Sequence, residues 1–323
     1  MTDDKHAPSV PSRRRVLGGG IAALTVSALA GSPAGSGSAR AATAQSTAAV
    51  LHRTIPSTGA SVPAVGLGSW ITFNVGDDPV LRADCAEVMD AFFLSGGTIV
   101  DSSPMYGSAQ EVIGAGLARI DRTGSVFSAD KVWTGDTDDG RAQIEQSRSN
   151  WQVPRFDLVQ VHNLVGWEAH LETLAAMKAA GEVKHIGITT SHGRRHGLFE
   201  EVMRARELDF IQVTYNPVDR EVEDRILPLA RERGIAVLVN RPFRRGALTQ
   251  RLDGEPLPAW AAEIGADTWA QLVLKFILSH TAATIPIPAT TQPHHARENV
   301  AAAAGPLPDA GMREKIAATI RDL

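Results

Sequence analysis

Cysteine and aromatic residues are scarce in this chain of 323 residues. The single cysteine, Cys85, excludes an intrachain disulfide and a cysteine-based zinc cluster, and its apolar neighbours predict a buried helix position. Tyrosine occurs twice, and lysine occurs six times against 26 arginines. A formal net charge of -4 gives no general attraction to the phosphates of nucleic acid, so we expect no nucleic-acid partner. The hydrophobic share of 43% is ample for a globular core and excludes wholesale disorder.

A long hydrophobic run is also missing. The apolar stretch from Gly18 to Gly31 is shorter than the ~20 residues of a membrane-spanning helix, so we expect no membrane span. It follows Ser12-Arg13-Arg14-Arg15 and precedes a stretch of small residues that includes Ala42-Thr43-Ala44. This order is typical of a bacterial export signal, and the paired arginines resemble the twin-arginine (Tat) class. We therefore expect residues 1–44 to be read by the Tat machinery and the protein to act in the periplasm or outside the cell; a disordered basic arm is the alternative.

From residue 51 onward, short β-branched runs alternate with stretches of helical period, which is the pattern of parallel βα units. A hairpin is predicted from Arg53 to Pro63, with its turn at Ser57-Thr58-Gly59. Strands are then predicted near 65–70, 98–102, 126–133, 157–162, 185–189, 210–214, 235–239 and 284–288. Helices are predicted near 79–95, 108–119, 139–150, 167–180, 195–206, 221–233, 266–280 and 294–303.

Eight strands, each followed by a helix and with no compositional boundary between them, predict a single (β/α)8 TIM barrel over residues 45–323. The alternative is a doubly wound open sheet. That fold is expected to carry a glycine-rich fingerprint after its first strand, and Gly66-Leu67-Gly68 lacks the third glycine.

Four polar residues stand near the ends of the predicted strands, where barrel enzymes place their chemistry. Asp101 ends the second strand, Tyr106 follows it, Lys131 lies in the third and His162 ends the fourth. Such residues in one mouth can transfer a proton, because a lysine beside a tyrosine lowers the tyrosine pKa from about 10 toward neutrality. The structural alternatives are an ion pair between Asp101 and Lys131, a core tyrosine at 106 and a buried histidine at 162.

An ordered set of motifs makes residues 51–303 resemble the aldo/keto reductase family. The motifs are Val100-Asp101-Ser102-Ser103-Pro104-Met105-Tyr106-Gly107, Lys131-Val132-Trp133, Asp157-Leu158-Val159-Gln160-Val161-His162, Gly181-Glu182-Val183-Lys184-His185-Ile186-Gly187-Ile188, Ile285-Pro286-Ile287-Pro288 and Glu298-Asn299. The resemblance implies a barrel that binds NADP(H) or NAD(H) across its mouth and reduces a small aldehyde or ketone. It also implies that Tyr106 donates the proton, Lys131 acidifies it, Asp101 holds the lysine and His162 donates a hydrogen bond to the carbonyl oxygen.

The cofactor positions match the family less well. Thr189-Thr190 stand where family members usually place a Ser-Asn pair for the nicotinamide carboxamide, whereas Gln212 fits the third carboxamide ligand. Asn240 replaces the aromatic ring that commonly stacks on nicotinamide. The arginines of the loop that follows, Arg241, Arg244 and Arg245, could bind the pyrophosphate or an acidic substrate, and Phe243 is a further cofactor-binding candidate; a solvated loop is the alternative.

After the last strand, Thr290 and His295 face the expected adenosine 2'-phosphate position, followed by Glu298 and Asn299 for the adenine. Because the usual cations are absent there, we expect little preference for NADPH over NADH unless Arg244 or Arg245 reaches the phosphate.

Two tryptophans, Trp70 and Trp167, are predicted to wall an apolar substrate pocket; core or rim packing is the alternative. His192 and His196 lie four residues apart without a visible third ligand, so no metal site is expected. A non-catalytic sensor or accessory subunit using the same barrel stays open as the alternative function, because export removes the protein from the cytoplasmic cofactor pool. The sequence indicates neither the substrate nor the oligomeric state.

Overall fold

The computed structural model describes residues 49–282 and 284–323. It begins with the predicted hairpin, in which β1 (His52–Thr54) pairs antiparallel with β2 (Ser61–Pro63). Gly59 takes the positive φ of +72° that the turn requires. Ile55 and Val62 are buried in one cluster with Leu158, Phe210 and Leu238, so the hairpin closes the end of the barrel opposite the carboxyl ends of its strands.

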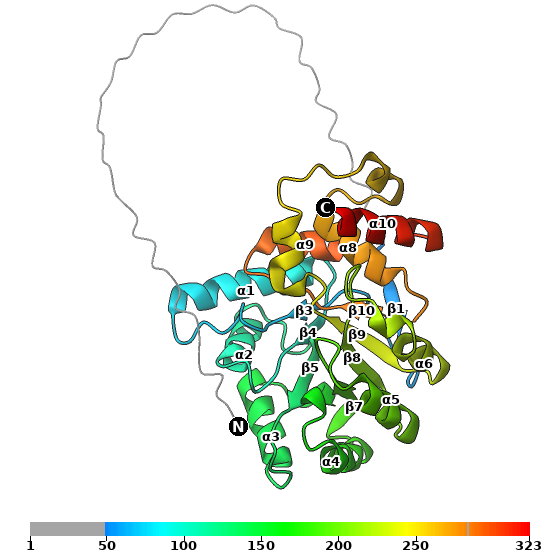
Figure 1. Ribbon diagram of the computed structural model, residues 1–323. Helices are drawn as coiled ribbons and strands as arrows, with labels where there is room; N and C mark the ends of the chain where they lie inside the picture. Colours follow the sequence, from blue (N-terminus) through cyan, green and yellow to red (C-terminus); the bar gives the residue numbers. More distant parts are fainter. Residues whose placement is uncertain (1–48, 283) are drawn as a thin grey trace, which may run out of the picture. The chain divides into compact units, whose positions relative to one another are not determined.

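Eight parallel strands form the barrel, as the sequence predicts (Figure 1). They are β3 (Leu67–Gly68), β4 (Ile99–Asp101), β5 (Phe127–Val132), β6 (Phe156–Val161), β7 (Val183–Thr189), β8 (Phe210–Thr214), β9 (Ala236–Asn240) and β10 (Thr284–Pro286). The first and last strands meet through Gly66 N to Pro286 O at 2.9 Å and Gly68 N to Pro288 O at 3.1 Å. Gly68 is needed here, because a Cβ at this position would lie 2.7 Å from the carbonyl oxygen of Ile287.

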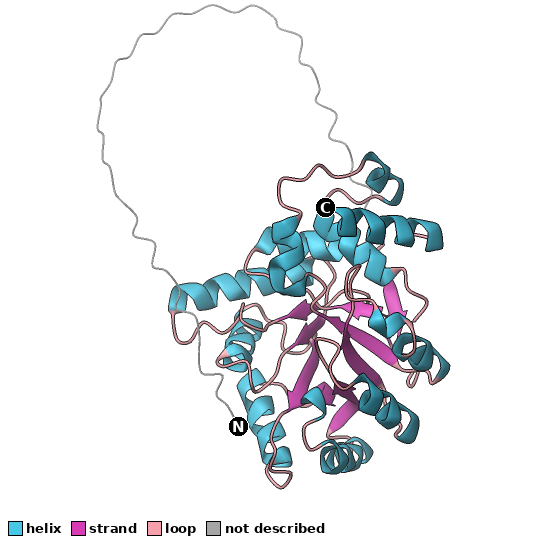
Figure 2. Cartoon of the chain, in the orientation of Figure 1, coloured by secondary structure: helices cyan, strands magenta, loops and turns pink. Residues whose placement is uncertain are grey.

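Helices surround the sheet in Figure 2 and cover its outer face. They are α1 (Pro79–Leu94), α2 (Ala109–Arg119), α3 (Gly140–Trp151), α4 (Trp167–Ala179), α5 (His196–Ala205), α6 (Ile226–Glu232), α7 (Ala247–Arg251), α8 (Trp269–Leu278), α9 (Pro293–Ala301) and α10 (Ala310–Asp322). No helix among the described residues is both long enough and apolar enough to cross a membrane.

The helix predicted over 221–233 is two pieces, a 3-10 turn at Glu221–Glu223 and then α6. The break falls at Arg225, and Pro228 lies in the first turn of α6, where its missing N–H costs no helical hydrogen bond. Helices α7 and α10 lie outside the eight predicted βα units: α7 has only five residues, and α10 follows the last unit of the barrel.

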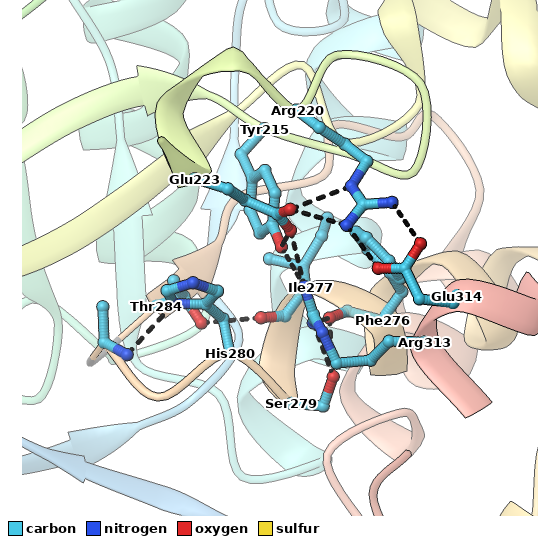
Figure 3. Close-up of polar contacts among 11 residues, drawn as sticks. Tyr215, Arg220, Glu223, Phe276, Ile277, Ser279, His280, Thr284, Arg313 and Glu314 are labelled. Carbon is cyan, nitrogen blue, oxygen red and sulfur yellow. Dashed lines mark hydrogen bonds and ion pairs between the residues drawn. The ribbon is translucent and has the colours of Figure 1, made fainter. Parts of the chain in front are cut away.

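Arg313 fastens α10 to the barrel (Figure 3). Its guanidinium donates to Glu223 Oε1 at 2.6 Å and to the Tyr215 hydroxyl at 2.5 Å, and also to the carbonyl oxygen of Phe276 at 2.5 Å and Ser279 Oγ at 2.8 Å. Helix α10 is therefore tied both to α8 and to the segment that follows β8. Arg220 adds a second link between α10 and this segment, because it forms ion pairs with both Glu223 and Glu314.

Candidate active site

A buried ion pair lies at the centre of the carboxyl ends of the strands. Lys131, on β5, is 0% exposed, and its Nζ lies 2.7 Å from Asp101 Oδ2 and 2.6 Å from the carbonyl oxygen of Ser102. The second oxygen of Asp101 accepts a hydrogen bond of 2.9 Å from Gln212 Nε2, so both carboxylate oxygens are bonded. Burial alone would lower the pKa of Lys131, but Asp101 and the nearby Tyr106 raise it, and the ammonium stays charged.

Tyr106 lies on the loop between β4 and α2, directly above this pair. Its ring centroid is 5.3 Å from Lys131 Nζ, and it meets the His162 ring edge-on with the centroids 5.9 Å apart. Burial raises the pKa of the Tyr106 hydroxyl more than the Lys131 charge lowers it. This corrects the expectation of a pKa near neutrality. The phenol therefore holds its proton and is a neutral donor at the mouth.

His162 opens the 3-10 turn after β6 and lines the mouth with Asp101 and Tyr106. Burial and the Lys131 charge lower the pKa of its imidazole to about 2, so the ring is neutral at every physiological pH. Nδ1 of His162 lies 2.8 Å from Ser103 Oγ. The structure thus brings the four predicted catalytic side chains together: Asp101, Tyr106 and His162 line a mouth cavity of about 350 Å³, and Lys131 contacts Asp101 from the buried side.

Three further side chains of the mouth have bonding capacity suited to a carboxamide. Gln212 uses its amide N–H on Asp101, which leaves its carbonyl oxygen free to accept. The Thr189 hydroxyl accepts a 2.9 Å hydrogen bond from the backbone N–H of Asn163, so its own hydrogen is free to donate. The Thr190 hydroxyl donates its hydrogen to the carbonyl oxygen of Arg194 at 2.6 Å, so toward a ligand it can only accept a hydrogen bond. Gln212 and Thr189 together therefore fit both halves of a nicotinamide carboxamide.

Asn240 lines the mouth but is already bonded at both ends of its amide. Thr214 Oγ1 donates to its Oδ1 at 2.6 Å, and its Nδ2 donates to the carbonyl oxygen of Thr190 at 2.9 Å. Asn240 therefore supports the backbone of Thr190, and it has no aromatic ring that could stack on a nicotinamide. Trp70, another residue of the mouth, has the Arg245 guanidinium 3.9 Å from its ring centroid.

A second cavity of about 660 Å³ continues from the mouth, and Trp70, Arg241 and Arg245 line both. Its mouth end is positive: Arg241 Nε is buried without a hydrogen-bond partner among the described residues, as expected of a group awaiting an anion. Arg244 instead pairs with Asp219 at 3.1 Å and lines neither cavity, so its prediction as a cofactor ligand is corrected. Arg245, the next arginine of the same loop, lines both cavities instead.

The far end of this cleft contains the predicted adenosine residues together with a group of acids. Phe243, Thr290, His295, Glu298 and Asn299 all line the cleft. Asp253, Glu255 and Asp267 line it as well, and within the described part of the chain none of these carboxylates, nor Glu298, has an ion-pair partner. The cleft is therefore positive toward the mouth and negative at its far end.

Trp70 lies at the mouth as predicted, 6.5 Å from Tyr106 between ring centroids. Trp167 does not, which corrects the expectation that it walls the substrate pocket. It begins α4 and packs against the outer core, with the Arg206 guanidinium 5.8 Å from its ring centroid. Across residues 49–282 and 284–323, no group of three or more histidine, cysteine or acidic side chains is arranged to hold a metal.

Comparisons with known proteins agree with this geometry. The model of the aldo/keto reductase family matches residues 64–318. Aldo-keto reductase YhdN of Bacillus subtilis is 28% identical over 219 residues, which cover 63% of this chain and 65% of that protein, so the match spans just under two thirds of its length. The NADH-specific methylglyoxal reductase of Escherichia coli is 25% identical over 240 residues, covering 61% of this chain and 68% of that protein.

A solved structure shares the architecture. The aldo/keto reductase from Klebsiella pneumoniae in complex with NADP and acetate has a TM-score of 0.67 at 23% identity, covering 83% of this chain and 95% of that one. The fold, the four side chains converging on one mouth and a family match over most of the sequence lead to one conclusion: the chain belongs to the aldo/keto reductase family.

Proposed function

We propose that this protein reduces a small aldehyde or ketone to an alcohol, with Tyr106 as proton donor and a nicotinamide cofactor as hydride source. The observation that carries the proposal is the Tyr106 ring packed 5.3 Å from the Nζ of the fully buried Lys131 at the edge of a cavity. A core tyrosine beside a structural ion pair has no need to line a cavity or to face a neutral histidine across it. A panel of carbonyl compounds, followed by loss of the reduced-cofactor absorbance, tests the proposal, and the absence of turnover on every compound would favour the non-catalytic alternative.

Each residue has a separate task in this reaction. A bound reduced nicotinamide supplies the hydride that the carbonyl carbon receives. His162 donates a hydrogen bond to the carbonyl oxygen and orients it, and Tyr106 gives its proton to that oxygen as negative charge develops. Lys131 stabilises the phenolate that is left, while Asp101 keeps the lysine charged and in place. Hydride and proton together convert the carbonyl to an alcohol, and solvent returns a proton to Tyr106.

For the cofactor, we propose that the cleft accepts NADP(H) or NAD(H), with the carboxamide held by Thr189 and Gln212 and the pyrophosphate near Arg241 and Arg245. The acids of the far end support NADH as the better ligand, because a carboxylate repels a 2'-phosphate and accepts a hydrogen bond from a free ribose hydroxyl. We expect NADH to bind at least as tightly as NADPH when protein fluorescence is titrated with each. A thousandfold preference for NADPH would contradict this expectation.

Neutralising part of that acidic end tests its role directly. Asp253→Asn combined with Asp267→Asn is expected to tighten NADPH binding by about tenfold and to leave NADH binding nearly unchanged. Asp84→Asn combined with Glu87→Gln, which removes two exposed carboxylates on α1 outside the cleft, is the control for the change in net charge.

We also propose export by the Tat route, supported by the motif around Arg13 and Arg14; residues 1–44 lie outside the described residues. Replacing both arginines by lysine should keep the protein in the cytoplasm, because the route distinguishes the guanidinium pair from two ammonium groups. Cell fractionation followed by immunoblotting measures the result. Unchanged export of the double variant would rule out this route.

A further inference from the structure

The hydroxyl of Ser103 is placed to set which nitrogen of His162 carries the proton. Both side chains are buried, at 0% and 6% exposure, and Ser103 Oγ lies 2.8 Å from His162 Nδ1. His162 lines the mouth cavity, but Ser103 does not. Ser103 therefore reaches a substrate only through the histidine.

The bonding of Ser103 favours one direction for this hydrogen bond. Its Oγ already accepts a bond from the Met105 amide at 3.4 Å, and His162 Nδ1 is the one acceptor that lies within reach of its hydrogen among the described residues. A neutral imidazole carries one proton, so a nitrogen that accepts from Ser103 forces that proton onto the other nitrogen. Nε2, which has no hydrogen-bond partner within the described chain, then carries an N–H.

We propose that Ser103 is a positioning residue that holds His162 as the Nε2–H tautomer, so that the ring presents a donor to the carbonyl oxygen. This inference rests on the proposed reduction. The opposite tautomer would turn a lone pair toward the carbonyl oxygen, which repels it and leaves the developing negative charge without its second donor. Because His162 is neutral, no change of pH in the working range replaces the missing proton.

The experiment compares wild-type protein with Ser103→Ala, which removes one oxygen and leaves the volume of the site almost unchanged. Nitrogen-15 spectra of histidine-labelled protein distinguish the two tautomers, and a His162→Gln spectrum identifies the signal. We expect wild-type protein to show the Nε2–H form alone and Ser103→Ala to show a mixture. The variant should lose about tenfold in kcat, the equivalent of one hydrogen bond, with KM and cofactor affinity unchanged.

Ser95→Ala is the matched control, because its hydroxyl also makes a 2.8 Å bond, to the carbonyl oxygen of Ala91, but at the end of α1. It should alter neither kcat nor the His162 signal. The proposal is overturned if Ser103→Ala keeps the Nε2–H form alone, if its tautomer changes while kcat does not, or if lost kcat accompanies only lost thermal stability. A wild-type protein that shows the Nε2–H form but reduces no carbonyl would instead count against the proposed function.

Discussion

Tyr106→Phe is expected to lower kcat/KM by about 10²- to 10⁴-fold while NADH and NADPH still bind, because a positioned general acid contributes a factor of that size. The substitution removes only the hydroxyl. The ring keeps its contacts with Trp70 and His162, so the thermal stability should change little. Turnover of a carbonyl substrate and fluorescence titration of the cofactor, measured on the same preparation, separate loss of chemistry from loss of binding.

The other tyrosine provides the control. Tyr215 is fully buried, and its hydroxyl donates to Glu223 in the network that fastens α10. Tyr215→Phe should therefore cost about 1 kcal/mol of stability and leave kcat/KM intact, the reverse of the result expected at Tyr106. Near-normal turnover in Tyr106→Phe would show that the proton comes from another group.

Lys131→Met is expected to damage both stability and turnover. It removes the cation from a buried ion pair and leaves Asp101 with Gln212 as its remaining side-chain partner, and breaking such pairs costs about 3–5 kcal/mol. The phenolate of Tyr106 also loses its stabilising charge, so we expect turnover to fall by about 10²-fold or more even in the folded fraction. Denaturant unfolding and initial rates measure the two effects.

A second buried lysine provides the control that separates loss of a buried charge from loss of catalysis. Lys275, on α8, is likewise 0% exposed, but it donates to the carbonyl oxygens of Ala304 and Pro306 and not to a carboxylate. Lys275→Met should lose stability and keep the kcat of the folded protein. Adding Asp101→Asn to Lys131→Met should recover stability without recovering turnover. Equal stability loss with undiminished kcat in Lys131→Met would remove the lysine from the mechanism.

The barrel and the four catalytic positions could be predicted from the sequence because both depend on local patterns. Alternation of strand and helix sets the fold, and residues at strand ends must meet at one face of a closed barrel. The position of Asp101 and Lys131 on adjacent strands follows directly from that pattern. How deeply Tyr106 is buried does not follow from it, and the burial of its own hydroxyl is what raises the Tyr106 pKa against the effect of Lys131.

The cofactor contacts were predicted less well because they lie on loops. Arg244 and Arg245 are neighbours with positive φ values of 49° and 62°, and no pattern in the sequence indicates which one faces the cleft. Trp167 was misplaced because it lies beyond the 3-10 turn that follows β6, as the first residue of α4, and packs outward with that helix. Ser103 stood within a recognised motif, yet its bond to His162 depends on a loop conformation that the motif does not contain.

The fastening of α10 by Arg313 has a consequence for the order in which the protein matures. The segment after β8 that holds Arg313 also contains Asp219, which pairs with Arg244 on the loop that shapes the cofactor cleft. Helix α10 leaves the ribosome after every barrel strand. We therefore expect the cleft to reach its final form only when synthesis has passed Arg313, so that a nascent chain with a complete barrel does not yet retain cofactor.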